Sequence, residues 1–588
     1  MESSRPRDST TSDRRFGAVV RRCASRYGGQ VDWLFAIAIA LAVIVALVGI
    51  DFKIGAASIR AHGPVRVLLV AIILFAIRWR IGIGSVPAWL TRITLLTLIC
   101  GSVLTWFRFL LSTIGGADSY GYVSASHMLA SGRLIDPAPI AEWLTAPNRL
   151  AIASPLGWAP APDGAGIAPT FPIGASALMA LFTLAGGQQA VFFVAPMMAL
   201  LALALVYRAT RNWFDEEAAL LAVAILAWNP VFITYAKQPM SDVPATAWVT
   251  LAIVLAIQRG ALSAFGAGLA AGAAVITRPA LLIAAATIPF VSLRGQARYQ
   301  RFVLSGLGAA IGVGVQMAIQ AKLFGSPLVT GYGSAEGAFS WAHVPVNLMI
   351  FAKQIWLAFG PIWLIGTVTG LVISRPDLRW RLLTVFAAVT LPYLFWLPFD
   401  HWETLRFLLP GVAILSAVIG ASFMTLARRM RVRPMAAIVP ALLAVMLFGR
   451  SEWLLRDSSQ WVIQSLEARY PLAGEWVNVN TPLNSVMMAN QHSGSLRWYG
   501  KRQTIRWDFV EPRRLAATVS ELQSHGAVVY VALEGDEVAM FEERFKDVID
   551  QLQVDHVGRI RNISFRRLKL RYEKEPATFL REPKLRKP

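Results

Sequence analysis

Long apolar runs alternate with short polar segments over the first three quarters of this 588-residue chain. A helix of about 20 apolar residues crosses the hydrocarbon core of a bilayer. The runs lie near residues 31–50, 65–77, 89–111, 190–207, 217–235, 245–258, 263–277, 279–293, 302–321, 355–373, 382–398, 407–426 and 435–449. The pattern predicts an all-α polytopic membrane bundle of about thirteen transmembrane helices, in which the shorter runs tilt or borrow flanking residues.

Arginines gather in every second loop between these runs, which favours a cytoplasmic N-terminus because arginine-rich loops stay inside. The predicted inside loops hold Arg78, Arg80, Arg92, Arg208, Arg211, Arg259, Arg294, Arg298, Arg301, Arg375, Arg379, Arg381, Arg428, Arg429, Arg431 and Arg433. The apolar stretch Thr170–Gly186 would invert this order if it crossed, so we expect it to lie on the outer leaflet. Residues 112–189 then form one long external loop, with a helix over Tyr120–Ser131.

Strands and helices alternate after Arg450. We predict strands over Ser485–Ala489 and Ala527–Leu533, helices over Gly494–Tyr499, Glu511–Ser524 and Glu537–Asp550, and one or two strands over His556–Leu570. This order predicts a small extracytoplasmic α/β domain. The expected organisation is a disordered basic cytoplasmic N-terminus (1–30), a transmembrane domain (31–450), the α/β domain (451–573) and a flexible tail (574–588).

Composition supports a membrane protein, with 55% hydrophobic and 15% charged residues. Most of the net charge of +21 is spread through short loops of residues 1–450, which is a topology signal. Nucleic-acid binding requires a clustered basic face and is not expected. Cys23 and Cys100 are too few for a metal framework and do not indicate a disulfide.

Asp118 is the first candidate for chemistry, because it follows an apolar run directly and opens the long external loop. A carboxylate at a membrane exit is costly unless it has a role. We interpret Asp118 as a general base that accepts a proton from an acceptor hydroxyl. The alternative is an N-cap for the helix Tyr120–Ser131. Tyr120 and Tyr122 follow it and are candidates for substrate contacts.

The other external loops carry further candidates. Asp242 precedes an apolar run and is either a substrate ligand or a helix N-cap. Lys237 either neutralises a phosphate or extends along the membrane surface. Arg278 either binds a lipid phosphate through two hydrogen bonds or is a turn residue.

The loop Phe399–Pro410 contains Glu403 and Arg406, which either pair with each other or bind the donor's phosphate and sugar. A metal site is a further hypothesis, with Asp118, Asp242, His401, Asp400 and Glu403 as candidate ligands. No Walker loop, dinucleotide fingerprint, HExxH or GxSxG motif occurs. Since no nucleotide site is recognisable, an external enzyme is expected to receive its activated donor attached to lipid.

Several of these motifs also follow one another in the order of a known family. They are Asp118-x-Tyr120-x-Tyr122 with Leu129-x-x-Gly132, Phe171-Pro172-Ile173-Gly174, Tyr207-Arg208-x-x-Arg211, Ser241-Asp242-x-Pro244, Gly268 with Thr277-Arg278-Pro279, and Glu403-x-x-Arg406-x-x-x-Pro410. The chain resembles GT-C type integral-membrane glycosyltransferases, the bacterial family of aminoarabinose transferases, protein O-mannosyltransferases and rhizobial lipopolysaccharide sugar transferases.

The resemblance implies a bacterial inner-membrane enzyme that transfers a sugar from a polyprenyl-phosphate donor to an extracytoplasmic acceptor, a cell-envelope glycan, lipid or protein. Asp118 matches the catalytic acid residue of the family. Several members carry a second acidic residue beside it, where this chain has Ser119, which puts a two-carboxylate metal site in doubt. Two alternatives stay open: a lipid-linked polysaccharide polymerase or ligase, and a non-catalytic glycolipid transporter or flippase.

Overall fold

The computed structural model describes residues 29–46, 50–54, 57–61, 65–80, 88–333, 339–429 and 433–571. The chain divides into two compact units. The first, the helical unit, comprises residues up to 112, 172–322 and 326–464; the second, the mixed unit, comprises 113–171, 323–325 and the chain from 465 onward. Part of the predicted external loop therefore folds with the C-terminal α/β region, which the sequence pattern did not predict.

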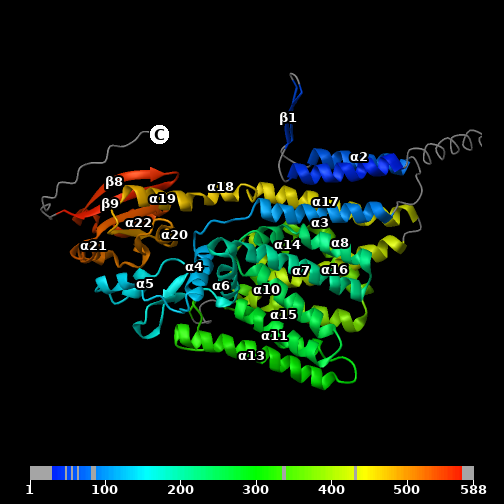
Figure 1. Cartoon of the computed structure of the whole chain (residues 1–588), viewed down its shortest axis with the longest axis horizontal. Helices are drawn as coiled ribbons and strands as arrows, with labels where there is room; N and C mark the ends of the chain where they lie inside the picture. Colours follow the sequence, from blue (N-terminus) through cyan, green and yellow to red (C-terminus); the bar gives the residue numbers. More distant parts are fainter. Residues whose placement is uncertain are drawn as a thin grey trace, which may run out of the picture. The chain divides into compact units, whose positions relative to one another are not determined.

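Helices that run roughly parallel to one another make up the helical unit (Figure 1). After Gly29–Ala46 and a β-hairpin of β1 (Ile50–Ile54) and β2 (Ala57–Ala61), they are α2 (Val65–Arg80), α3 (Ala88–Arg108), α6 (Ile173–Gly186), η3 (Gln188–Phe193), α7 (Val194–Trp213), α8 (Glu216–Ala227), α9 (Pro230–Ala236), α10 (Asp242–Ile257), α11 (Ala261–Thr277), η4 (Pro279–Leu281), α12 (Leu282–Val291), α13 (Arg298–Phe324), α14 (His343–Ile373), α15 (Pro376–Phe395), η6 (Trp402–Leu408), α16 (Leu409–Arg429) and α17 (Arg433–Asp457).

Within the described residues, seven helices are long and apolar enough to cross a membrane, or eight if one bent pair counts as a single span. The bent pair is α8 and α9, which meet at 68°. Asn229 and Pro230 cause the break, because Asn229 caps α9 by accepting from Phe232 N and Pro230 starts a new helix. The chain is thus a multi-pass membrane protein.

The predicted count of about thirteen spans is not confirmed. The runs near 245–258 and 263–277 form α10 and α11, with 16 and 17 residues, and the run near 279–293 forms η4 and the 10-residue α12. Helices of these lengths are shorter than the hydrocarbon core they would have to cross. The predicted surface helix is α6, whose 14 residues are also too few for a span.

Arginines from separate predicted inside loops lie together at one end of the helical unit. Arg301 donates to the carbonyl oxygens of Ser292 at 3.0 Å and Ala256 at 2.7 Å, and Arg381 donates to Leu293 at 3.0 Å. These carbonyls end α10 and α12, where the helix dipole favours a cation. Arginines from two of the predicted inside loops therefore stabilise neighbouring helix ends.

A five-stranded sheet organises the mixed unit, with strand order β6-β5-β7-β9-β8. Its elements are α4 (Asp118–Ala130), η1 (Pro139–Trp143), α5 (Arg149–Ala153), β3 (Trp158–Pro160), η2 (Pro162–Gly164), β4 (Ile167–Pro169), α19 (Arg469–Asn480), β5 (Ser485–Ala489), α20 (Ser493–Trp498), β6 (Gln503–Ile505), η7 (Trp507–Phe509), η8 (Pro512–Arg514), α21 (Leu515–Ser524), β7 (Val528–Glu534), α22 (Glu537–Phe545), η9 (Ile549–Gln551), β8 (Leu552–Ile560) and β9 (Ile563–Leu570). The short helix α18 (Ile463–Glu467) connects the two units along the chain.

The predicted α/β domain is confirmed in outline. Strand β5 pairs parallel with β6 and β7, whereas β9 pairs antiparallel with β7 and β8. The core packs Leu496, Phe565 and Tyr530 between the sheet and its helices. Strand β6 was missed, because three residues are too short for a period-2 pattern. The predicted disordered N-terminus and flexible tail lie outside the described residues, apart from Gly29 and Gln30.

Candidate functional site

A buried carboxylate with two arginines nearby is the main charged cluster at the predicted external end of the helical unit. Asp242 opens α10 with its side chain 3% exposed, and its Oδ1 accepts a hydrogen bond from Arg278. Arg406 Nε lies 4.0 Å from the same oxygen. Two guanidinium groups and one carboxylate leave a net positive charge. Three of the predicted substrate-binding residues are therefore brought together from three separate loops.

Aromatic rings surround both guanidinium groups. The Phe407 ring lies 5.1 Å from Arg278 Cζ and 5.2 Å from Arg406 Cζ, and it stacks on Tyr393 at 4.7 Å. Tyr235 adds a second ring 5.4 Å from Arg406 Cζ. Cation–π contacts of this kind hold arginines in place while leaving their N–H groups able to donate. The arginine side chains are 15% and 25% exposed, so an anion can reach them.

Lys237 lies in the interior of the helical unit. Its side chain is fully buried, its Nζ donates to the Gln460 carbonyl oxygen at 2.5 Å, and it lies 5.1 Å from the Trp461 ring. Burial lowers the pKa of Lys237 to about 7, against the attraction of Glu403 and Glu452. In this structure Lys237 supports the helix ends and does not reach the surface.

The loop before α16 divides its polar residues between different partners. Glu403 Oε1 accepts from Gln460 Nε2 at 2.7 Å, while Asp400 accepts from Lys353 and Gln354, each at 2.6 Å. His401 is largely exposed and accepts from Glu403 N. No group of three or more His, Cys, Asp or Glu among the described residues is arranged to hold a metal ion.

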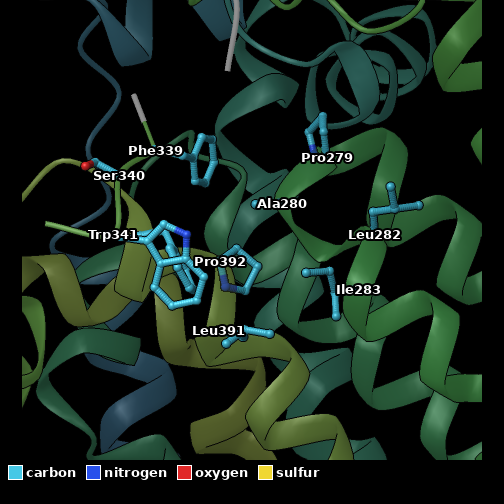
Figure 2. Close-up of a pocket in the computed structure, with 10 residues that line it drawn as sticks. Pro279, Ala280, Leu282, Ile283, Phe339, Ser340, Trp341, Leu391 and Pro392 are labelled. Carbon is cyan, nitrogen blue, oxygen red and sulfur yellow. The ribbon is translucent and has the colours of Figure 1, made fainter. Parts of the chain in front are cut away.

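An apolar cavity of about 470 Å³ lies beside this cluster. Pro279, which lines the cavity, directly follows Arg278 in the chain. Figure 2 shows Trp341 and Phe339 on one side of the view and Ile283 and Leu282 on the other, with Pro392 next to Trp341. The remaining lining residues are Ala280, Ser340, Leu391 and Phe395. Trp341 lines the cavity, whereas neither Trp356 nor any residue of α6 belongs to its lining.

Asp118 lies in the mixed unit, as the first residue of α4 and half-buried. The N-cap is Ala117, without a side-chain capping bond, so Asp118 does not cap the helix. Ser119 does not cap it either. Its Oγ donates to the Thr113 carbonyl at 3.0 Å and accepts from Gly115 N at 3.1 Å, which folds the preceding loop onto the first turn.

Tyr120 and Tyr122 point into the mixed unit and are 4% and 6% exposed. Tyr122 stacks on Phe171 with ring centroids 4.9 Å apart. Burial raises the pKa of the Tyr120 phenol, with Arg497 opposing that rise. Both tyrosines therefore fix the position of α4, and their contribution to substrate contacts stays a prediction.

Known proteins resemble this chain in part of its sequence and in its fold. Residues 168–319 match the family model described as dolichyl-phosphate-mannose-protein mannosyltransferase. Crystal structures of ArnT from Cupriavidus metallidurans, bound to undecaprenyl phosphate and in the apo state, align with TM-scores of 0.54 and 0.50. Each is 13% identical and covers 80% of this chain and 97% of ArnT. The arabinofuranosyltransferase AftD from Mycobacteria aligns at a TM-score of 0.43 and 11% identity, over 82% of this chain and 40% of its own.

No curated protein matches the chain significantly. The family match covers about a quarter of the sequence, across α6 to α13, and the ArnT fold extends over both units. Both findings agree with the resemblance stated above: residues 168–319 match the mannosyltransferase family model, and the chain shares the fold of ArnT. The particular donor and acceptor follow from neither comparison.

Sequence reasoning missed several residues that complete these clusters. Gln460 bridges Lys237 and Glu403, and Glu452 is buried with its carboxylate 3.0 Å from Arg456 Nε. Glu452 and Arg456 lie four residues apart at the end of an apolar run, which is a helix-pair signal that the sequence contains. Gln460 carries no comparable signal.

Proposed function

We propose that this enzyme transfers a sugar from a polyprenyl-phosphate donor to an extracytoplasmic acceptor at the bacterial inner membrane. The observation that carries the proposal is the position of Arg278. Its guanidinium binds Asp242 beside Arg406, and the next residue in the chain, Pro279, lines an apolar cavity. A lipid phosphate requires this combination, because its head is anionic and its tail apolar.

Arg278 and Arg406 hold the donor phosphate in this proposal. A phosphate leaving group is a stable anion and needs positive charge more than a proton donor. Asp242 holds the two guanidinium groups in place, close to the site proposed for the lipid phosphate. ArnT, whose fold this chain shares, has been crystallised with undecaprenyl phosphate, which supports a lipid phosphate as the ligand class.

Asp118 acts as the general base in the same proposal and accepts the proton of the acceptor hydroxyl. A half-buried carboxylate in the first turn of α4 suits this task. Lys237 and Glu403 act from the interior, through Gln460, by supporting the loops that carry Asp242 and Arg406. Tyr120 and Tyr122 fix the helix that carries the base.

The test is donor binding and transfer by the purified protein with a panel of polyprenyl-phosphate sugars. We expect one or more donors to be consumed when an envelope acceptor fraction is present, and Arg406→Gln to weaken donor binding. Release of the donor without transfer of its sugar to an acceptor would contradict the proposal. Movement of intact donor across vesicles without cleavage would instead favour the transporter alternative, and formation of long glycan chains would favour the polymerase or ligase.

A further inference from the structure

The C-terminal α/β region encloses the loop that leads into Asp118. Strand β5 lies between β6 and β7 and is parallel to both. The chain goes from β5 to β6 on one side and then crosses to β7 on the other, so the direction of the connections reverses at β5. The carboxyl ends of parallel strands at such a reversal are where α/β folds usually bind ligands. The segments at this edge are Asn490–His492 after β5 and Glu534–Glu537 after β7.

Residues 114–116 occupy this edge. A Cβ atom added to Gly115 would lie 2.1 Å from Tyr470 Cδ2, so the ring of Tyr470 covers the Gly115 backbone. A Cβ on Gly116, which has a φ of +61°, would lie 3.4 Å from both Gln491 Nε2 and Tyr470 Oη. The Ile114 amide donates to the Tyr499 hydroxyl at 2.9 Å. Where a ligand is usually bound, this domain holds its own chain.

A network of partly buried polar groups fixes the two residues that contact the glycines. Gln491 Nε2 donates to Tyr470 Oη at 2.6 Å, and Arg469 NH2 donates to the same oxygen at 3.1 Å. The Glu537 carboxylate accepts from the backbone amides of Gln491 and Glu534, each at 2.9 Å. The edge of the sheet therefore has little freedom to move away from the loop.

A second contact fixes the helix that follows. Gly494 is the second residue of α20, and a Cβ there would lie 2.4 Å from the ring of Tyr120. Tyr120, which follows Asp118 by two residues, thus packs directly on the backbone of α20. The α/β domain contacts the chain both before and after the carboxylate.

We propose that Tyr470 and Gln491 are positioning residues that hold Gly115-Gly116 and thereby set the place of Asp118. This inference rests on the proposed role of Asp118 as the base. It makes the C-terminal domain part of the catalytic machinery, in contrast to a detachable acceptor-binding module. A misplacement of about 1 Å can reduce turnover about 100-fold.

The test uses the full-length chain with Gly115→Ala, Tyr470→Ala, Tyr470→Phe and the double variant Gly115→Ala/Tyr470→Ala. Tyr530→Phe, on β7 of the same sheet, is the matched control. We expect Gly115→Ala to lower kcat about 100-fold with little change in donor KM. In the Tyr470→Ala background the ring that would clash with the added methyl group is absent, so Gly115→Ala should lower kcat little further. Tyr470→Phe keeps the ring and should lose about tenfold or less.

Amide hydrogen exchange over residues 113–121 provides a readout that does not depend on activity. Tyr470→Ala should raise exchange there about tenfold or more, with the core strands β5 and β7 unchanged. Unchanged exchange, or additive effects of Gly115→Ala and Tyr470→Ala on kcat, would overturn the inference.

Asp118→Asn, assayed in parallel, separates the two proposals. If Asp118→Asn is inactive while the loop variants keep the kcat of the wild type, only the positioning role fails. If Asp118→Asn stays active, the base assignment fails and the positioning role fails with it.

Discussion

Asp242, whose carboxylate is buried, forms an ion pair with the partly buried Arg278 although 36 residues separate them in the sequence. The pair joins the start of α10 to the end of α11, two helices that pack against each other. Breaking a buried ion pair is more costly than never forming one, because the remaining charge loses its partner. Both the stability of this protein and its proposed donor affinity should therefore depend on Asp242.

Replacing Asp242 with asparagine should destabilise the helical unit. Loss of one partner of a buried pair costs about 3 kcal/mol. Thermal unfolding of the purified protein in detergent measures the change. Asp377→Asn is the control, because Asp377 is 52% exposed and lies 3.5 Å from Arg294, where the loss should be about 0.5 kcal/mol or less. Equal effects of the two substitutions would argue against a buried pair at Asp242.

Arg406→Gln should weaken donor binding more than it weakens the fold. One guanidinium–phosphate contact contributes on the order of 1.5–3 kcal/mol, so the Kd for a polyprenyl phosphate should rise about 10- to 100-fold. Arg428→Gln is the control. Arg428 lies in a loop that is predicted to be inside, and it pairs there with Asp215 and Glu217. If both variants bind the lipid equally well, Arg406 does not contact the phosphate.

Narrowing the apolar cavity should discriminate donors by the length of their lipid. Ala280→Trp places a large ring in the cavity that Trp341 and Ile283 line. We expect KM to rise about tenfold for a long polyprenyl donor and to change little for a donor with a short chain. Trp356→Ala, which alters an exposed tryptophan outside the cavity lining, should affect neither donor. A change for both donors alike would mean that Ala280→Trp disturbs the phosphate site.

The pH dependence of stability should reveal the buried lysine. The folded-state pKa of Lys237 is lowered to about 7 from 10.5, so the unfolded chain binds more protons at this side chain above about pH 7. Stability therefore rises with pH from about 7 to 9 through this group. The midpoint of thermal unfolding in wild type should gain a few degrees relative to Lys237→Met over that range. Parallel pH profiles would show that Lys237 titrates normally.

The sequence predicted the clusters better than the spans. Asp242, Arg278 and Arg406 were selected because each breaks an apolar run at a loop that the arginine pattern placed outside, and charge in such places is costly. Helix count depends instead on where each helix ends. The bend at Asn229-Pro230 and the short α12 follow from capping and packing that an apolar run does not reveal.

Lys237 illustrates what a single sequence omits. A lysine in a predicted external loop has the same pattern whether it contacts solvent or folds inward. Only tertiary contacts with Gln460 and Trp461 bury it. The contact between Gly115 and Tyr470 could not be predicted from the sequence either, because Tyr470 lies far along the chain and within a different predicted domain.

The central claim, that Asp118 is the base of a glycosyl transfer, is tested most directly by turnover of wild type and Asp118→Asn on one polyprenyl-phosphate sugar. General-base catalysis contributes about 10²- to 10⁴-fold, so kcat should fall by that factor while the Kd for the donor stays near its wild-type value. Turnover within a few-fold of wild type would contradict the account.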